Sequence, residues 1–315
     1  MLSTIAAIAL LAGCLPVTAS AATSLAAPNS THQRTTSWML KTKVGAPLVY
    51  VSDVDFNTVT VFDRGGQTVG RIGGLNGPEG LFVDADHNLW VANSGASQIL
   101  EFARGATSPT KILSDKGGLP SDVTMCPNGT LYVSNSKLSN ARGGNILLYA
   151  PGSTRPTGKL TFPHEFQAYF LTCDAAGNIF ETLTIINKMT GAGGAAVVEY
   201  PGGRQAGATR LPMKHSFFPG GIKQDHAGNL LIAEGVSINE YTEAGLPTGV
   251  SIKSPDSYTA PVGIDVTGNV LGVALFDPTG RDAEGQTYAF PKGTALQAYG
   301  RFNKPIGFAF DSGVK

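Results

Sequence analysis

A pattern that recurs six times, at a spacing near 45 residues, constrains the fold of this chain more than any other feature. Each copy has a β-prone stretch that ends in an aromatic residue and a glycine-rich turn. The six aromatic residues are Phe62, Phe102, Tyr149, Tyr200, Tyr241 and Phe290, separated by 40, 47, 51, 41 and 49 positions. A unit of this size forms one small antiparallel sheet that cannot bury both of its faces alone, so several units must stack around an axis.

A second motif, Pro-x-Gly or a variant of it followed by a short apolar stretch, accompanies the first. It occupies residues 78–84, 120–126, 219–225, 261–267 and 305–311, and a degenerate copy, AYFLTCD, occupies residues 168–174. Turns such as DADHN (84–88), DAAGN (174–178) and DHAGN (225–229) follow it. Asp can accept hydrogen bonds from main-chain N–H groups in a turn, and Gly supplies positive φ. We therefore predict four strands per copy, a to d, with a tight hairpin between a and b.

The two ends of the repeat region complement each other. The first full strand, LVYVSD (48–53), matches the b strand NLWVAN (88–93), and no a strand precedes it. The chain finishes with KPIGFAFDSGVK (304–315), an a strand with no b strand after it. A ring closed by both ends removes exposed sheet edges at the closure. The sequence thus predicts an all-β, six-bladed β-propeller over residues 47–315, with blade one shared between residues 48–75 and 304–315.

The first 46 residues differ in composition from the repeats. Residues 1–22 predict a signal peptide, because the apolar run from Ile5 to Leu15 is shorter than the ~20 residues of a membrane span. The ASA at 19–21 suits ordinary cleavage, whereas LAGC at 11–14 resembles a bacterial lipobox that would lipidate Cys14. Both routes stay open, and either one exports the mature protein to the periplasm, the cell surface or the medium. Residues 23–46 are predicted to be a flexible leader, whose Trp38-Met39-Leu40 patch can dock on the folded body.

Composition excludes some classes of partner. Formal net charge is zero and only 15% of residues are charged, so we expect no general affinity for nucleic acid. Contact with a membrane is expected only through a lipid anchor on Cys14. We expect a monomer, because the repeats close on themselves.

The repeat motifs carry a family resemblance. Pro-x-Gly, Asp-x-x-Gly-Asn, stretches such as LWVAN and LYVSN, and an aromatic-ended third strand together resemble NHL-type repeats and the six-bladed group that includes SMP-30/gluconolactonase-like proteins. The resemblance covers residues 47–315 and implies a propeller fold. It does not define an activity, because propellers include binding proteins, scaffolds, lyases and lactonases.

Polar residues recur where strand b ends, at the mouth of the predicted central channel. The aligned positions are Asp53, Asn93, Asn135, Leu183, Glu234 and Ala274, and Glu79 at the start of the second a strand is a further candidate. Oxygen ligands of this kind suit Ca²⁺, Mg²⁺ or Mn²⁺, and such an ion could activate water against an ester or lactone. The resemblance to lactonases implies a metal held by a Glu, two Asn and an Asp. The alternative, which we favour, is that Asn and Asp recur there because they cap strand ends.

The sequence lacks a convincing catalytic group. It has no Gly-x-Ser-x-Gly, P-loop or dinucleotide fingerprint, and His164 and His215 with Glu165 and Glu234 are more typical of solvated loops than of acid–base pairs. The leading interpretation is therefore an exported, non-catalytic binding or scaffold module whose rim meets a protein, a glycan or a small ligand. The rival interpretation is a divalent-metal-dependent hydrolase or lactonase of the SMP-30-like type.

Two cysteines, Cys126 and Cys173, remain after removal of the signal peptide. An oxidising compartment favours a disulfide between them. Aligned on the repeat, however, Cys126 matches Asp84 whereas Cys173 matches Val83, and this offset of one residue places the two side chains on opposite pleat faces. The register therefore favours two buried free thiols over a disulfide.

Overall fold

The computed structural model describes residues 36–41, 45–138, 143–186, 193–213, 219–255, 259–277, 279 and 283–313. All of them belong to the second of two compact units, Arg34–Lys315, and none to the first, Met1–Gln33. The predicted signal peptide and its lipidation candidate Cys14 lie outside the described residues. Among the described residues, we find no helix with the length and apolar character needed to cross a membrane.

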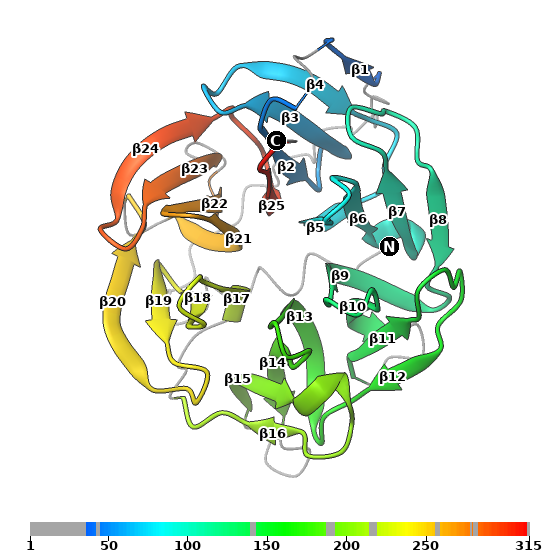
Figure 1. The fold of residues 1–315 in the computed structure, drawn as a ribbon, viewed down its shortest axis with the longest axis vertical. Coiled ribbons are helices and arrows are strands. Elements are labelled where there is room, and N and C mark those ends of the chain that lie inside the picture. The colour runs from blue at the N-terminus through cyan, green and yellow to red at the C-terminus, as the bar shows by residue number, and fades with distance from the viewer. Residues whose placement is uncertain are drawn as a thin grey trace, which may run out of the picture. The chain divides into compact units, whose positions relative to one another are not determined.

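Six antiparallel sheets surround one axis in residues 36–313 (Figure 1), which confirms the predicted six-bladed β-propeller. In every blade strand a lies nearest the axis and strand d at the periphery. From strand a to strand d, blade one consists of β25 (Pro305–Asp311), β2 (Leu48–Asp53), β3 (Thr58–Asp63) and β4 (Thr68–Ile72). Blade two consists of β5 (Pro78–Val83), β6 (Leu89–Asn93), β7 (Gln98–Phe102) and β8 (Lys111–Ser114). Blade three consists of β9 (Gly118–Met125), β10 (Leu131–Leu138), β11 (Asn145–Tyr149) and β12 (Gly158–Leu160). Blade four consists of β13 (Glu165–Cys173), β14 (Ile179–Ile186), β15 (Gly193–Tyr200) and β16 (Thr209–Arg210). Blade five consists of β17 (Pro219–Gln224), β18 (Leu230–Glu234), β19 (Ser237–Tyr241) and β20 (Pro247–Lys253). Blade six consists of β21 (Ala260–Thr267), β22 (Val270–Phe276), β23 (Glu284–Ala289) and β24 (Thr294–Tyr299).

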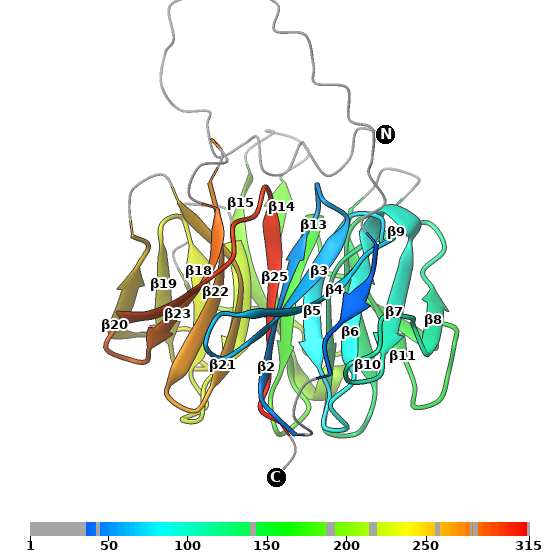
Figure 2. The same ribbon diagram turned by 90° about the horizontal axis from the view of Figure 1, so that it is seen from above.

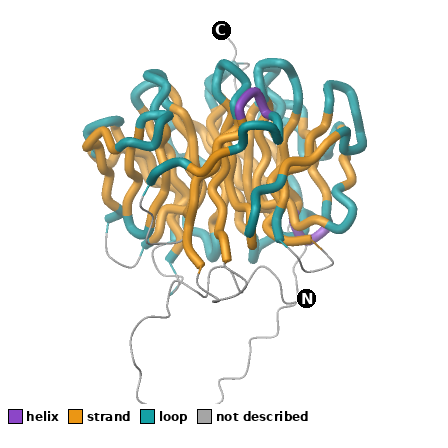
Figure 3. The backbone as a smooth tube through the Cα atoms, turned by 90° about the horizontal axis from the view of Figure 1, so that it is seen from below, coloured by secondary structure: helices purple, strands orange, loops and turns teal. Residues whose placement is uncertain are grey.

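The strands run between two rims, where the loops gather (Figure 3). We call one the b–c rim, because strands b end there and strands c begin there; the connections between blades lie on it too. The other, the a–b rim, carries the hairpins from a to b and from c to d. Among the described residues, two short 3-10 helices mark the rims, η2 (Ser94–Ala96) on the b–c rim and η3 (Pro201–Gly203) on the a–b rim.

The ring closes as predicted, through the two ends of the repeat region. Strand β25 pairs antiparallel with β2, with Leu48 opposite Asp311 and Val51 opposite Phe308, and Figure 2 shows the two strands side by side. The predicted leader adds a fifth strand to this blade, β1 (Trp38–Met39), which pairs with the outer strand β4. One sheet therefore joins residues from both ends of the described chain.

Alternation of side chains along the strands packs each blade against both neighbours. Between blades six and one, for example, Val51, Phe62, Ala274 and Phe308 belong to one buried cluster. The rings of Phe62 and Tyr299 meet edge to face with centroids 5.6 Å apart, a favoured aromatic geometry. The core of the propeller is thus a series of layers between blades.

The recurring Asp of the a–b hairpins has one structural role. Asp84 accepts hydrogen bonds from the main-chain N–H groups of Asp86 and Asn88, both at 2.9 Å. Asp174 accepts one at 2.7 Å from the N–H of Asn178, four residues further on, and Asp225 accepts one at 2.8 Å from Asn229. The repeated Asp therefore satisfies turn N–H groups that strand pairing leaves free.

The Gly of the Pro-x-Gly motif is required by the close approach of a strands at the axis. A Cβ on Gly263 would lie 2.1 Å from the carbonyl oxygen of Ile306, and one on Gly307 would lie 2.4 Å from that of Glu79. Both distances are far below van der Waals contact. At Gly263 and Gly307 glycine is needed because the neighbouring inner strand leaves no room for a side chain, whereas the aligned positions of blades three and four carry Asp122 and Phe170.

Substituting this glycine should destabilise the protein. We expect Gly263→Ala to lower the free energy of unfolding by about 1–3 kcal/mol, because the added methyl group must displace a neighbouring strand. A matched Gly194→Ala variant, whose Cβ would meet nothing within 4 Å, should be neutral or slightly stabilising. Urea unfolding of both variants checks the expectation, and equal midpoints would contradict it.

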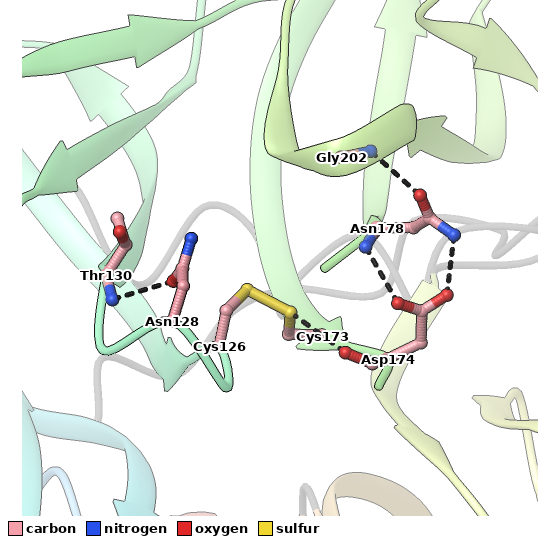
Figure 4. The surroundings of a disulfide bond; sticks show 7 residues. All are labelled: Cys126, Asn128, Thr130, Cys173, Asp174, Asn178 and Gly202. Atoms are coloured by element: carbon pink, nitrogen blue, oxygen red, sulfur yellow. Dashed lines mark hydrogen bonds between the residues drawn. A yellow bond between two sulfur atoms is a disulfide. The ribbon is translucent and has the colours of Figure 1, made fainter. Parts of the chain in front are cut away.

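Cys126 and Cys173 form a disulfide, with Cα atoms 5.4 Å apart, beside the a–b hairpins of blades three and four (Figure 4). The prediction of two free thiols was therefore wrong. The offset of one residue was assigned correctly, but the argument applied to one sheet, whereas these cysteines lie in two sheets that face each other. The face of blade three that points toward blade four packs on the face of blade four that points back toward blade three, as the shared cluster of Tyr132, Leu171 and both cysteines shows. A disulfide between successive blades therefore requires the two cysteines to lie on opposite pleat faces of their own sheets.

Candidate functional site

Inner strands of several blades line a small cavity at the axis of the described propeller. It leaves ≈ 10 Å³ for the centre of a water molecule, and Gly80, Phe170, Lys223 and Phe308 are among its lining residues. About one water fits in such a volume. We therefore expect a larger ligand to contact a rim rather than this cavity.

A buried cluster of charged side chains lies beside this cavity. Lys223, only 9% exposed, lies between Asp122 and Asp265, and its charge lowers the pKa of both carboxyl groups against the larger effect of burial. Burial nevertheless raises the pKa of Asp122 to about 6. Asp122 also accepts a hydrogen bond of 3.1 Å from the N–H of Leu171 in the next blade. These groups connect inner strands and leave little charge free for a ligand at the axis.

Of the predicted strand-end residues, Asp53 and Asn93 hold neighbouring loops. Asp53 is buried and accepts main-chain hydrogen bonds from Phe56 at 3.1 Å and Asn303 at 2.7 Å, across the ring closure. Asn93 accepts one at 2.7 Å from the N–H of Asn76, in the connection that enters blade two. Both contacts are those of a capping residue.

Asn135 and Glu234 are held within their own blades. Asn135 donates to the side-chain oxygen of Asn145 at 3.1 Å, and Glu234 accepts at 2.7 Å from both Asn239 and the Tyr241 hydroxyl. The aligned Leu183 and Ala274 are buried and apolar. In the described part of the chain, no three His, Cys, Asp or Glu side chains lie close enough to share a metal ion, so the structure does not bring Asp53, Glu79 and Glu234 together.

Glu79, the fifth predicted residue, is a buried carboxylic acid near the axis. Burial raises its pKa to about 8; the nearby Ser94 hydroxyl and the charge of Lys304 oppose this rise, and Asp122 adds to it. The charge of Glu79 in turn contributes to the raised pKa of Tyr169 in blade four. With no cation beside it, Glu79 is therefore mostly protonated at pH 7 and able to donate a hydrogen bond.

The raised pKa of Glu79 makes stability depend on pH. Between the unfolded pKa near 4.5 and the folded value of about 8, the folded state binds more protons than the unfolded state, so the free energy of unfolding falls as pH rises. We expect the melting temperature to decrease from pH 5 to pH 8.5, with a shallower slope in Glu79→Gln, which is neutral throughout. Calorimetry across this range checks the expectation, and a Glu79→Gln slope equal to that of the parent would contradict it.

Buried polar atoms without a hydrogen bond of standard geometry gather on one rim. Among the described residues eleven such side-chain atoms occur. Those near the starts of a strands or near the ends of b and d strands, hence toward the b–c rim, belong to Arg71, Glu79, Ser94, Asp115, Asn135, Glu165, Thr184 and Ser254. Native proteins leave few buried polar atoms unpaired, so a cluster of them needs a physical explanation such as water, an ion or a ligand.

On the a–b rim, by contrast, the carboxylates of Asp84 and Asp311 are fully used. Both oxygens of Asp84 accept hydrogen bonds, one of them from Trp90 Nε1 at 2.8 Å. Asp311 accepts from Arg104 Nε at 2.5 Å and lies 2.7 Å from His87 Nδ1. The polar groups of the a–b rim stabilise the fold, and the b–c rim is the candidate site.

Sequence reasoning missed Asp115 on this rim and considered Glu165 only as a possible partner of a loop histidine. Asp115 follows β8, and burial raises its pKa to about 6. Glu165 begins β13, and burial raises its pKa to about 7; its charge adds to the raised pKa of the buried Glu181 in the same blade. The repeat alignment could not single them out, since they occupy loops or unaligned positions in single blades.

Comparison with known proteins identifies the fold but not a family. No protein-family model matches the sequence, and no curated protein matches it. Among solved structures, hydrazine synthase of Kuenenia stuttgartiensis aligns with TM-score 0.58 and 16% identity, over 72% of this chain and 77% of that one. A streptogramin B lyase aligns with TM-score 0.53 and 14% identity, over 87% and 90%, and a gluconolactonase-like protein with TM-score 0.50 and 12% identity, over 76% and 88%. At these identities the similarity shows a shared propeller fold alone.

Proposed function

We propose that this chain is an exported, non-catalytic binding propeller whose ligand-contacting face is the b–c rim. The observation that carries the proposal is the gathering, toward that rim, of buried polar atoms without a hydrogen bond of standard geometry, against the fully bonded Asp84 and Asp311 on the other. The described strand ends beneath it are held by Asp53 and Asn93. A rigid frame with unused hydrogen-bonding capacity is typical of a preorganised binding surface.

The chemistry of these atoms favours a ligand rich in hydroxyl or N–H groups. Apart from Arg71 Nε, these atoms of the rim are carboxyl, amide and hydroxyl oxygens, which accept hydrogen bonds, and a neutral Glu79 can also donate one. Phe56 and Phe166, which are 54% and 46% exposed, lie in the b–c turn of blade one and at the start of β13. Exposed aromatic rings beside oxygen acceptors suit the alternating apolar and hydroxyl faces of a glycan.

A panel of immobilised oligosaccharides tests this proposal. The parent chain should bind a subset of them, and Phe166→Ala and Glu79→Gln should weaken that binding about tenfold or more, the loss expected for one well-placed contact. Asp86→Asn, an exposed change on the a–b rim, is the matched control and should bind like the parent. Retained binding in both rim variants would refute the placement of the site.

A metal-dependent hydrolase or lactonase of the SMP-30-like type is the second candidate, favoured by the buried acid Glu79 and by the fold shared with a gluconolactonase-like protein. A resident divalent ion would raise the melting temperature by mass action. Titration with Ca²⁺, Mn²⁺ and Zn²⁺, followed by a chelator, separates the two candidates. A shift that Glu79→Ala and Asn135→Ala abolish, together with lactone hydrolysis, would favour the enzyme.

Export is supported by the Cys126–Cys173 disulfide, since structural disulfides are stable chiefly in oxidising compartments. The mass of the mature N-terminus distinguishes the two predicted processing routes. A diacylglyceryl adduct on Cys14 indicates a lipoprotein, and an unmodified start near residue 22 indicates ordinary cleavage.

A further inference from the structure

The side chain of Lys223 carries a positive charge across the axis of the propeller. Lys223 lies in β17 of blade five and is only 9% exposed. Its Nζ is 5.9 Å from the ring centroid of Phe82, in β5 of blade two, and blade two stands opposite blade five in the ring (Figure 1). A cation over an aromatic face is attracted to it, but this contact does not replace the water that a buried ammonium group loses. The ammonium group therefore needs further partners.

Two carboxyl groups are close enough to feel this charge, but neither pairs with it directly. Burial raises the pKa of Asp122 and of Asp265, and the charge of Lys223 is the largest opposing effect on both. The ion pairs of the described residues, with N–O distances up to 4.0 Å, do not include Lys223. Charged groups that interact across such a gap are typically joined by water.

The axial cavity lies beside these groups and has the size that a bridging water needs. Lys223 and Asp122 both line it, and it leaves ≈ 10 Å³ for the centre of a water molecule. A Cβ on Gly80, which also lines the cavity, would lie 2.1 Å from Asp122 Oδ1, so this oxygen is directly beside the cavity wall. One water fits in such a volume, and an ammonium donor with a carboxylate acceptor supplies polar partners for it.

We propose that one water molecule occupies the axial cavity and bridges the ammonium group of Lys223 to the carboxylate of Asp122. The ammonium group donates a hydrogen bond to the water, and the water donates one to Asp122. The site lies at the axis and uses no residue of the b–c rim, so the inference does not depend on the proposed binding function.

The bridge gives one lysine a connection to every blade. Asp122 belongs to blade three and accepts a hydrogen bond of 3.1 Å from the N–H of Leu171 in blade four. Asp265 belongs to blade six and accepts one of 2.8 Å from the N–H of Phe310 in blade one. With Phe82 of blade two and Lys223 of blade five, this network includes an inner strand of all six blades.

Water-selective nuclear Overhauser spectroscopy of the ¹⁵N-labelled full chain tests the bridge. A water held in the cavity should give cross-peaks, with the sign of a long-lived internal water, to the amide protons of lining residues such as Gly221 and Gly263. Gly272, which is buried in β22 and is not among the lining residues, is the control and should give none. Absence of such cross-peaks at the lining residues would overturn the proposal, and this measurement needs no variant.

Substitution of the lysine tests its role in holding the water. Lys223→Met keeps the length of the side chain and removes the charge, so the cross-peaks should disappear. The melting temperature should fall by about 6 °C or more, because two buried carboxyl groups lose their cation. Lys159→Met, the same change at an exposed position of β12, should keep both the cross-peaks and the melting temperature of the parent. Persistence of the cross-peaks in Lys223→Met would overturn the assignment of the water to this lysine.

A double-mutant cycle tests the connection between the two charged groups. Asp122→Asn removes one charge at almost constant shape. The melting temperature of Lys223→Met/Asp122→Asn should lie about 2 °C or more above the value expected from adding the two single losses, because the second change removes a group that the first left without its partner. Losses that simply add would overturn the bridge between Lys223 and Asp122.

Discussion

Deleting strand β25 (Pro305–Asp311) should abolish cooperative folding of the propeller, although the deletion leaves five sheets intact. All seven residues of β25 are buried. Burial of Ile306, Phe308 and Phe310 alone contributes roughly 5–9 kcal/mol, at about 1.5–3 kcal/mol for each side chain. That amount is comparable with the whole free energy of unfolding of a typical domain, about 5–15 kcal/mol.

The loss extends beyond the strand itself. Without β25, the inner edge of β2 has no partner strand, and the contacts that the buried Asp311 carboxylate makes with His87 and Arg104 disappear. Circular dichroism and a thermal melt of a chain ending at residue 304 check the expectation. A two-state transition at the temperature of the parent would contradict it, and with it the role of β25 as the closure.

A circular permutant provides the matched control, because it keeps β25 but changes its connection. A Cβ on Gly313 would lie 2.1 Å from the carbonyl oxygen of Gly45, so the two ends of the propeller touch and a short linker can join them. New ends fit between Gly152 and Ser153, in the exposed c–d turn of blade three. The permutant should fold with a cooperative transition, whereas the same permutant without residues 305–313 should not.

The fold could be predicted because its determinants repeat. Each a–b hairpin needs an Asp to satisfy its N–H groups, as Asp84 and Asp174 do, and close contact between inner strands needs a Gly such as Gly263. A requirement that acts in several blades leaves a period in the sequence. The closure was visible for a related reason: β25 keeps the motif of an a strand while its b partner is at the other end of the chain.

The site and the disulfide were harder to predict, because they depend on contacts between blades. Asp115 and Asn135 meet across two sheets, and no alignment of repeats shows which faces of successive blades are opposed. The same missing information, which faces of successive blades are opposed, produced the wrong prediction for Cys126 and Cys173. Burial, which raises the pKa of Glu79 to about 8, likewise follows from three-dimensional packing and not from residue type.

Removing the Cys126–Cys173 disulfide should cause the second large loss of stability. The two residues are 47 positions apart, and closing a loop of this length in the unfolded chain is worth about 4 kcal/mol in the chain-entropy model. We expect the Cys126→Ala/Cys173→Ala variant to unfold at a markedly lower guanidinium concentration than the parent. The loss should fall mainly on blades three and four, whose a strands the bridge joins.

Reduction distinguishes loss of the bridge from loss of packing. Dithiothreitol should lower the unfolding midpoint of the parent toward that of the double alanine variant and should leave the variant unchanged. The number of titratable thiols in the denatured chain should rise by two on reduction, independently of the state of Cys14. Because the bridge crosses the interface between two blades, hydrogen exchange in β9 and β13 should accelerate more than exchange in β21, on the far side of the ring. A parent insensitive to reductant in both midpoint and thiol count would show that the two cysteines remain thiols and that packing alone holds blades three and four together.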